Sequence, residues 1–261
     1  MPEYREVGGH QLYCYEWDNN GEALVLLHGG LSQTSHWDQN ILPAVEDQFH
    51  VFGYDRTAHG FTGDRAGSLH FDYQVKEAIA YLETVVKEPA HLVGYSDGAV
   101  IALLVAIQRP DLVKSIVSIG GNFHYSGVDY EMGEPSVSEE DLAEYTLVSP
   151  DAPHTLLEKV TRMFKIWATE PDISKQQLAQ IQCPVLVVSG DDDMVTLKHT
   201  QELYETLPLG QLAVLPGTSH ALVKEKPDLF IALMMQFLED LSYPVTMVPN
   251  RRTNPISNQP E

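Results

Sequence analysis

The chain has 261 residues, a length at which one compact domain can bury a large hydrophobic core. Hydrophobic residues make up 43% of it and aromatic residues 9%, a composition typical of an ordered globular protein rather than a disordered one. The formal net charge of −21 argues against nucleic acid and anionic membranes as partners, because both attract clusters of Lys and Arg.

Several classes of sequence signal are missing. The two cysteines, Cys14 and Cys183, are too few for a disulfide framework, and we expect reduced thiols. The N-terminal segment MPEYREVGGH has no apolar stretch after a basic start, and no window comes near the roughly 18 apolar residues of a membrane span. No H-x-H or H-E-x-x-H spacing predicts a metal site, and no P-loop or G-x-G-x-x-G fingerprint predicts a nucleotide cofactor. We therefore expect a cytoplasmic protein without a metal or other cofactor.

Strand and helix signals alternate through the first 121 residues. Continuous apolar runs such as ALVLL at 23–27 are typical of strands buried on both faces of a sheet, whereas apolar residues at helical spacing, as at 71–86, predict helices. Strands separated by helices of this length predict a mostly parallel sheet with helices on both faces. The predicted strands are 4–7, 11–17, 23–27, 51–54, 90–93 and 114–119, and the predicted helices are 35–47, 71–86 and 98–108.

The alternation stops between residues 122 and 181, where no strand signal occurs. Helical pieces at 139–145 and 155–168 are separated by prolines, which predicts a helical insertion lying over the sheet as a small cap. Strands at 185–189 and 212–215 and helices at 197–206 and 227–241 then resume the pattern. We thus predict an α/β core from residues 1–121 and 182–241, a cap from 122–181, and a loosely packed tail at 242–261.

The segment Gly94-Tyr95-Ser96-Asp97-Gly98 fits the pattern G-x-S-x-G. By itself the pattern is a weak signal, since Gly and Ser are common residues. Here, however, it directly follows an apolar strand and precedes the helix-forming run AVIALLVAI. In that setting the glycines permit a sharp turn that exposes the serine hydroxyl at the edge of the sheet, and the helix N-terminus favours negative charge there. Ser96 is therefore a candidate nucleophile.

A serine hydroxyl needs a histidine to take its proton and an acid to orient that histidine. His220 follows the last predicted strand across the turn PGTS, at the carboxyl edge of the sheet where ligands bind. Three candidate acids follow the strand before it: Asp191, Asp192 and Asp193. The resulting chain order of Ser, Asp and His is that of α/β hydrolases.

From about residue 4 to residue 241 the chain resembles the α/β-hydrolase superfamily of serine hydrolases. In that family the acid is commonly the fourth residue of a G-x-x-D turn, which implies Asp193 within the segment GDDD. The segment GTSHALVKEKP resembles the family's histidine loop, which supports His220. The oxyanion hole is expected from the backbone N–H of Asp97, directly after the nucleophile, and, by resemblance of the segment HGGL, from that of Gly30, with Leu31 as an alternative.

Other polar residues near these segments are given supporting roles. We expect His28 to be a buried, hydrogen-bonded support of the oxyanion loop. The segment DRTAHG resembles the family's Asp-x-Arg-Gly-x-Gly stretch but has Ala58 where glycine is usual. Because of that departure, Asp55 and Arg56 are assigned structural roles only.

The side chain of Asp97 has two interpretations, which do not exclude each other. An acid near a helix N-terminus can cap the helix. Alternatively, the segment GYSDGAVIALLVA is similar to the elbow of the biphenyl-hydrolase-like enzymes, which include valacyclovir hydrolase, and this similarity implies that Asp97 binds the α-ammonium group of a substrate. Phe123, at the base of the insertion, and Leu31 are further candidate substrate contacts.

Together these residues predict a serine hydrolase that cleaves an ester-like bond of a small molecule through an acyl-enzyme, with α-amino-acid esters as candidate substrates. Carbon–carbon bond hydrolases and cofactor-free perhydrolases use the same three residue types and stay open as alternatives. An alternative of another class is a hydrolase-fold protein that binds a small molecule without turning it over. The intact order of Ser, Asp and His argues against that last alternative.

Overall fold

The computed structural model describes residues 2–129 and 133–252 of the chain. Within these ranges the strands are β1 (Glu3–Val7), β2 (His10–Trp17), β3 (Ala23–Leu27), β4 (His50–Asp55), β5 (Ala90–Tyr95), β6 (Val113–Ile119), β7 (Val185–Gly190) and β8 (Gly210–Leu215). The α-helices are α1 (Leu42–Val45), α2 (Phe71–Tyr81), α3 (Asp97–Gln108), α4 (Glu139–Val148), α5 (Leu156–Trp167), α6 (Lys175–Leu178), α7 (Leu197–Thr206), α8 (Leu222–Glu225) and α9 (Pro227–Glu239). Short helices are η1 (Thr34–Trp37), η2 (Leu82–Val86), η3 (Pro110–Leu112), η4 (Tyr125–Gly127) and η5 (Pro153–Thr155).

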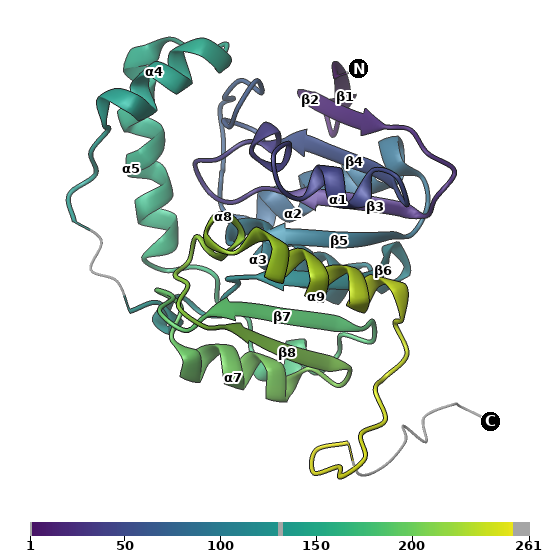
Figure 1. Cartoon of the computed structure of the whole chain (residues 1–261). Coiled ribbons are helices and arrows are strands. Elements are labelled where there is room, and N and C mark those ends of the chain that lie inside the picture. Colours follow the sequence, from purple (N-terminus) through teal and green to yellow (C-terminus); the bar gives the residue numbers. More distant parts are fainter. Residues whose placement is uncertain (1, 130–132, 253–261) are drawn as a thin grey trace.

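The strands form one sheet in the order β1-β2-β4-β3-β5-β6-β7-β8. β2 pairs antiparallel with β1 and β4, and every later pair in the sheet is parallel. Figure 1 shows α1 and α9 in front of the sheet and α2 and α3 behind it. Each face has its own buried cluster of side chains, one beneath α1 and α9 and the other beneath α2, α3 and α7. The predicted mostly parallel α/β sheet, covered by helices on both faces, is confirmed.

The buried strands follow directly from their sequences. All five residues of β3 are buried, because the strand pairs with β4 on one side and β5 on the other while helices cover both faces. The helix predicted at 71–86 is also present, as α2 followed by the π-helical turn η2. It ends at Lys87, whose φ of 65° is left-handed and cannot continue a helix.

The prediction of one helix at 35–47 is wrong. The structure has the 3₁₀ turn η1, an irregular segment and then the one-turn helix α1. Pro43 lies at the start of α1, and proline has no N–H to bond the carbonyl four residues earlier, so a continuous helix cannot cross this position. The four-residue helices α6 and α8 were not predicted, since so few residues carry no detectable periodicity.

Residues 122–181 carry helices and no strand of the sheet in the part that the structure describes. α4 begins with a capping box in which Ser138 and Asp141 satisfy each other's backbone N–H groups. α5 buries one side, including Leu156, Val160, Met163 and Ile166. In Figure 1 α5 lies beside the sheet, and α4 lies at the end of α5 that points away from the strands. No helix within the described ranges has the length and apolar character needed to span a membrane.

Only the first part of the predicted tail is described, and residues 253–261 lie outside it. Arg251 ties this part to the end of α7. Its guanidinium donates hydrogen bonds to the carbonyl oxygens of Tyr204 at 2.8 Å and Leu207 at 2.6 Å, and it lies 4.0 Å from the centre of the Tyr204 ring. An arginine thus satisfies carbonyl groups that the end of the helix leaves without partners.

Candidate active site

Ser96 lies in a strained turn between β5 and α3. Its backbone angles are φ 53° and ψ −117°, a conformation that costs a non-glycine residue on the order of 1–3 kcal/mol. Close packing explains the two flanking glycines. A Cβ added to Gly94 would lie 2.4 Å from the carbonyl oxygen of Gly98, and one added to Gly98 would lie 2.0 Å from that of Leu27. Only glycines allow strand, turn and helix to approach this closely.

His220 and Asp193 form a hydrogen-bonded pair. The His220 Nδ1 atom lies 2.8 Å from Asp193 Oδ1, and the Asp193 side chain is 0% exposed. The carboxylate also accepts a bond from the backbone N–H of Val195 at 3.0 Å. Since Nδ1 donates to the carboxylate, Nε2 of His220 is left as the basic nitrogen.

The other two acids of the same turn do not contact His220. Asp191 accepts a hydrogen bond from the backbone N–H of Thr218 at 3.1 Å, and both Asp191 and Asp192 are exposed. Asp191 thus ties together the turns that follow β7 and β8. The structure therefore distinguishes Asp193 from its neighbours by geometry.

Two residues that the sequence did not single out hold the His220 ring in position. A Cβ added to Gly120 would lie 2.8 Å from His220 Cε1, and Gly120 has a φ of +58°. The Tyr95 hydroxyl donates to the carbonyl oxygen of His220 at 3.0 Å, and the two rings lie 5.2 Å apart. Pairing of Tyr95 with Ile119 brings the ends of β5 and β6 together, so Ser96 and Gly120 lie side by side. The described residues include no direct hydrogen bond between Ser96 and His220, a bond that often tightens only when substrate binds.

The predicted oxyanion loop packs against the N-terminus of α3. A Cβ added to Gly29 would lie 3.4 Å from Ser96 Cβ, and one added to Gly30 would lie 2.6 Å from Asp97 Oδ2. Leu31 follows with a φ of 51° and an exposed side chain. The N–H of Asp97 is one of the first N–H groups of the helix, which have no acceptor inside the helix. The loop thus brings the predicted N–H donors to the vicinity of Ser96.

Buried polar groups fix the shape of this loop. His28 Nδ1 lies 2.8 Å from the Gly29 carbonyl oxygen, so Nδ1 carries the proton, while Nε2 accepts the backbone N–H of Arg56 at 3.1 Å. The Arg56 guanidinium donates to the same Gly29 oxygen at 2.7 Å. Burial and the nearby guanidinium hold the pKa of His28 well below its usual value. His28 is thus the buried, hydrogen-bonded support that we expected.

The Asp55 segment is structural, as predicted. Asp55 is fully buried and accepts hydrogen bonds from the backbone N–H groups of Thr34 at 2.8 Å and Phe61 at 2.9 Å. The departure at Ala58 also has a physical meaning, because Ala58 has a φ of 68°. Glycine adopts this left-handed conformation without strain, which explains why glycine is the family's usual residue there.

The Asp97 side chain does not cap its helix, which corrects one of the two interpretations. It is 5% exposed, and its Oδ1 accepts a hydrogen bond from the indole N–H of Trp167 in α5 at 2.9 Å. Its Oδ2 lies 3.9 Å from an Arg56 nitrogen and has no hydrogen-bond partner among the described residues. Burial raises the pKa of Asp97, and the nearby guanidinium and indole oppose that rise. The contacts therefore join the turn after Ser96 to the cap.

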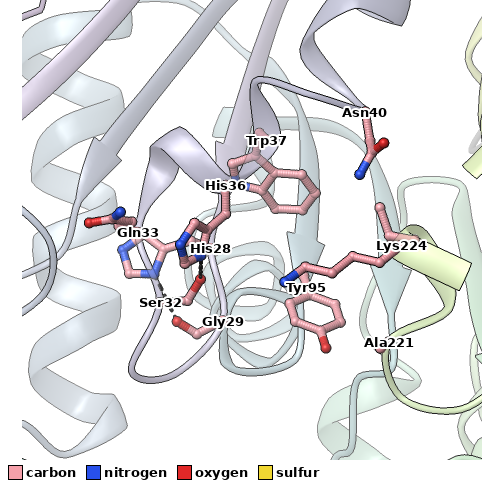
Figure 2. Close-up of a pocket in the computed structure, with 11 residues that line it drawn as sticks. His28, Gly29, Ser32, Gln33, His36, Trp37, Asn40, Tyr95, Ala221 and Lys224 are labelled. Carbon is pink, nitrogen blue, oxygen red and sulfur yellow. Dashed lines mark hydrogen bonds between the residues drawn. The ribbon is translucent and has the colours of Figure 1, made fainter. Parts of the chain in front are cut away.

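Two cavities are lined in part by residues of the predicted oxyanion loop, and Ser96 lines neither of them. The larger, about 240 Å³, lies between the cap and the core and is lined by Leu31. The smaller, about 120 Å³, includes Gly29, Tyr95 and Ala221 (Figure 2). In Figure 2 Lys224 extends from α8 toward the Tyr95 ring.

Phe123, predicted as a substrate contact, lines neither of these two cavities. It is buried and stacks on His199 with ring centres 3.9 Å apart. Its backbone N–H donates to His199 Nε2 at 3.1 Å. In the described ranges no group of three or more His, Cys, Asp or Glu side chains has the arrangement of a metal site.

Two relatives in sequence and one neighbour in structure, each named as a hydrolase, show what the chain is similar to. The sequence is 24% identical to "(E)-2-((N-methylformamido)methylene)succinate hydrolase" of Acinetobacter baylyi, over 90% of this chain and 97% of that protein. It is also 24% identical to human "Serine hydrolase BPHL", over 89% of this chain and 84% of that one. A crystal structure of a serine hydrolase involved in carbazole degradation, the CarC enzyme, superposes with a TM-score of 0.76. That structure is 17% identical and the match covers 92% of this chain and 98% of the other, a likeness of fold.

A sequence model of one protein family matches most of the chain. The match runs over residues 24–233, from β3 into α9, and the family is described as the alpha/beta hydrolase family. It includes the turn of Ser96, the acid Asp193 and the loop of His220. The chain belongs to the alpha/beta hydrolase family.

Proposed function

We propose that the protein is a serine hydrolase that cleaves an ester-like bond of a small molecule through an acyl-enzyme. The observation that carries this proposal is the 2.8 Å hydrogen bond between His220 and Asp193, formed beside the strained turn that presents Ser96. A buried carboxylate that fixes the imidazole tautomer is what a histidine needs in order to deprotonate a serine. Membership of a hydrolase family supports the same chemistry.

The reaction would proceed in two steps at this site. His220 Nε2 takes the proton of the Ser96 hydroxyl while the serine oxygen attacks the carbonyl carbon, and the oxyanion accepts hydrogen bonds from the N–H groups of Gly30 and Asp97. His220 then protonates the leaving alcohol, and the acyl group remains on Ser96. Water, deprotonated by His220, attacks the acyl carbon, and His220 returns the proton to the Ser96 oxygen as the bond between that oxygen and the acyl carbon breaks and the acid leaves. Asp193 stays ionised throughout and holds the ring. No metal or other cofactor takes part in this scheme.

Hydrolysis of p-nitrophenyl acetate, butyrate and octanoate tests the proposal. We expect turnover by the parent protein and a loss of about 10⁴-fold or more for Ser96→Ala, together with labelling of Ser96 by a fluorophosphonate in the parent only. If the parent is inert toward every ester and Ser96 resists labelling, ester hydrolysis is excluded. Carbon–carbon bond hydrolysis, perhydrolysis or non-catalytic binding would then take its place.

An α-amino-acid ester is a second, more specific candidate. The observation in its favour is Asp97 Oδ2, a buried carboxylate oxygen without a hydrogen bond among the described residues, next to the predicted oxyanion donors. Arg56 already supplies a positive charge 3.9 Å from that oxygen, and this charge reduces the attraction of the carboxylate for a substrate ammonium group. A preference for aminoacyl over acyl p-nitrophenyl esters, abolished in Asp97→Asn, would support this substrate class. Equal use of both ester classes would exclude it.

The proposed location is the cytoplasm. Its support is the pair of free cysteines, Cys14 and Cys183, which are typical of a reducing compartment.

A further inference from the structure

The indole of Trp167, at the end of α5 in the cap, lies against both residues that supply the predicted oxyanion donors. Its N–H donates to Asp97 Oδ1 at 2.9 Å. A Cβ added to Gly30 would lie 2.4 Å from Trp167 Cζ2 and 2.6 Å from Asp97 Oδ2. The predicted oxyanion donors are therefore in close contact with a side chain of the cap.

Asp97 carries a buried carboxylate with few partners. The residue is 5% exposed, and within the described ranges its side chain accepts a hydrogen bond only from Trp167. Arg56 lies 3.9 Å from Oδ2, too far for a hydrogen bond, and its guanidinium also donates to Gly29 and Gln74. Because a buried charge is costly unless it is paired and hydrogen-bonded, the ionised form of Asp97 depends on both Trp167 and Arg56.

The position of this carboxylate matters to the chemistry proposed at Ser96. Negative charge develops on the substrate oxygen as the serine attacks, and the predicted donors Gly30 and Asp97 are expected to bind that oxygen. A carboxylate in the same turn repels the oxyanion, and this repulsion is stronger in a buried site than in water. A hydrogen bond that fixes the carboxylate therefore also fixes the distance between the two negative charges.

The end of α5 is held firmly enough to place an indole. Met163 and Ile166 are buried in the cluster beneath α2, α3 and α7, and the Trp167 ring packs against the same cluster. Just beyond the helix, Glu170 accepts a hydrogen bond from the backbone N–H of Phe71 at 3.0 Å. The indole N–H is thus a preorganised donor, which needs no rearrangement when the oxyanion forms.

We propose that Trp167 is a positioning residue of the oxyanion hole. Its indole N–H holds the Asp97 carboxylate in place, and this keeps the N–H groups of Asp97 and Gly30 directed at the substrate oxygen. The inference rests on the proposed hydrolase function, because it presumes attack by Ser96. Trp167 acts only through Asp97 and Gly30, and it neither transfers a proton nor bonds to the substrate.

Trp167→Phe tests the role of the indole N–H, because phenylalanine keeps an aromatic ring beside Gly30 but has no donor. We expect kcat for p-nitrophenyl butyrate to fall about tenfold, the size of one hydrogen bond to a charged group. KM should stay within about twofold of the parent, since the oxyanion exists only in the transition state and intermediate. Trp17→Phe, in β2 where Trp17 stacks on Tyr15, is the matched control and should keep the parent kcat. Equal kcat in the two variants would overturn the proposal.

Removal of the charge at position 97 shows whether the effect passes through Asp97. In Asp97→Asn the side chain is neutral, so the loss of the indole donor should matter less. The kcat of Asp97→Asn/Trp167→Phe should therefore lie within about threefold of that of Asp97→Asn. A full tenfold loss in this background as well would contradict the role of the Asp97 carboxylate.

Hydrogen exchange of the indole N–H detects the contact without any turnover. The chain has three tryptophans, and the indole signal that is missing from the NMR spectrum of Trp167→Phe belongs to Trp167. In Asp97→Ala this N–H should exchange with solvent about tenfold faster, because its acceptor is gone, whereas the signals of Trp17 and Trp37 should not change. Unchanged exchange of the Trp167 N–H would overturn the proposal. Thermal unfolding of each variant verifies that it is folded.

The same measurements separate this inference from the proposed chemistry. Ester turnover by the parent, with an undiminished kcat in Trp167→Phe, would support the hydrolase and overturn the role of Trp167 alone. A parent that hydrolyses no ester and whose Ser96 resists the fluorophosphonate would overturn both, whatever the exchange of the indole N–H.

Discussion

Ser96 and Gly120 illustrate how single residues set the geometry of this site. The backbone of Ser96 is strained because its conformation is fixed by the strand before it, the helix after it and the two tightly packed glycines beside it. Gly120 has a left-handed φ and leaves room for the His220 ring, and any side chain there would meet that ring. The positions of the candidate nucleophile and base are thus determined by atoms that take no part in the chemistry.

Gly120→Ala should impair turnover more than stability. The new Cβ would lie 2.8 Å from His220 Cε1 and displace the imidazole, and a displacement of about 1 Å can lower the rate about 100-fold. We expect kcat for p-nitrophenyl butyrate to fall by about that factor, with a smaller change in KM. The control is Gly9→Ala, because Gly9 also has a positive φ, +82°, but no atom lies within 4 Å of its added Cβ. Equal losses of kcat in both variants would exclude a specific contact with His220.

At the scale of elements, the cap helices are held to the core by a few polar contacts. Glu144 of α4 bonds Gln33 and His36, which belong to the loop after β3 and to η1. Arg162 of α5 pairs with Asp64 at 2.5 Å, and Trp167 at the end of the same helix bonds Asp97 beside Ser96. α4 itself buries only Tyr145. Because it has so little buried apolar surface, its position depends on these polar contacts, whereas the position of the sheet depends on its buried core.

Glu144→Ala should therefore loosen α4 while the sheet keeps its stability. Because surface hydrogen bonds and ion pairs contribute little, the free energy of unfolding should change by less than about 1 kcal/mol. Amide exchange should accelerate in residues 139–148 but not in β5, and KM should rise about fivefold, equivalent to about 1 kcal/mol. Glu140→Ala, an exposed position of the same helix, is the control. Faster exchange in both variants, or in neither, would contradict the anchoring role of Glu144.

The whole molecule carries several buried histidines whose pKa values are lowered. Burial lowers the pKa of His59 to about 3 and that of His199 to about 4, and it holds that of His28 well below its usual value. In the unfolded chain each would bind a proton near pH 6.5. Below that pH the unfolded state takes up protons that the folded state cannot, so stability is lost as the pH falls. The buried acids Asp55, Glu77 and Asp97, whose pKa values are raised by burial, act in the opposite direction.

Comparison of variants isolates the contribution of one histidine. For His59 the stabilisation is complete above about pH 6.5 and is lost progressively toward pH 3. Urea titrations at pH 7 and pH 4 measure how much unfolding free energy each protein loses between these pH values. Because His59→Asn lacks the histidine, its loss should be smaller than that of the parent by up to about 3 kcal/mol. His154→Asn, an exposed histidine, should follow the parent. A parallel loss in His59→Asn and the parent would mean that His59 becomes protonated in the folded state near pH 6.5.

Much of the fold could be predicted from local sequence because the signals are local. The run ALVLL reads as a buried strand wherever it lies, and β3 has the predicted bounds. The G-x-S-x-G turn identified Ser96 because its strand and helix adjoin it in the chain. His220 could be selected among eleven histidines because it follows the last strand, and the carboxyl ends of parallel strands meet at one edge of the sheet. The sequence by itself thus determined the architecture and two candidate residues.

Other features depended on contacts between distant parts of the chain. Asp193 is distinguished from Asp191 and Asp192 only by which carboxylate faces His220, 27 residues away. Asp97 loses its expected capping role because Trp167, 70 residues further on, bonds it. The burial of His59, which is 5% exposed, likewise arises only when distant parts of the chain pack together. Local patterns determine elements, whereas side-chain pairing and burial arise only when those elements pack, and for this reason the tertiary structure decided them.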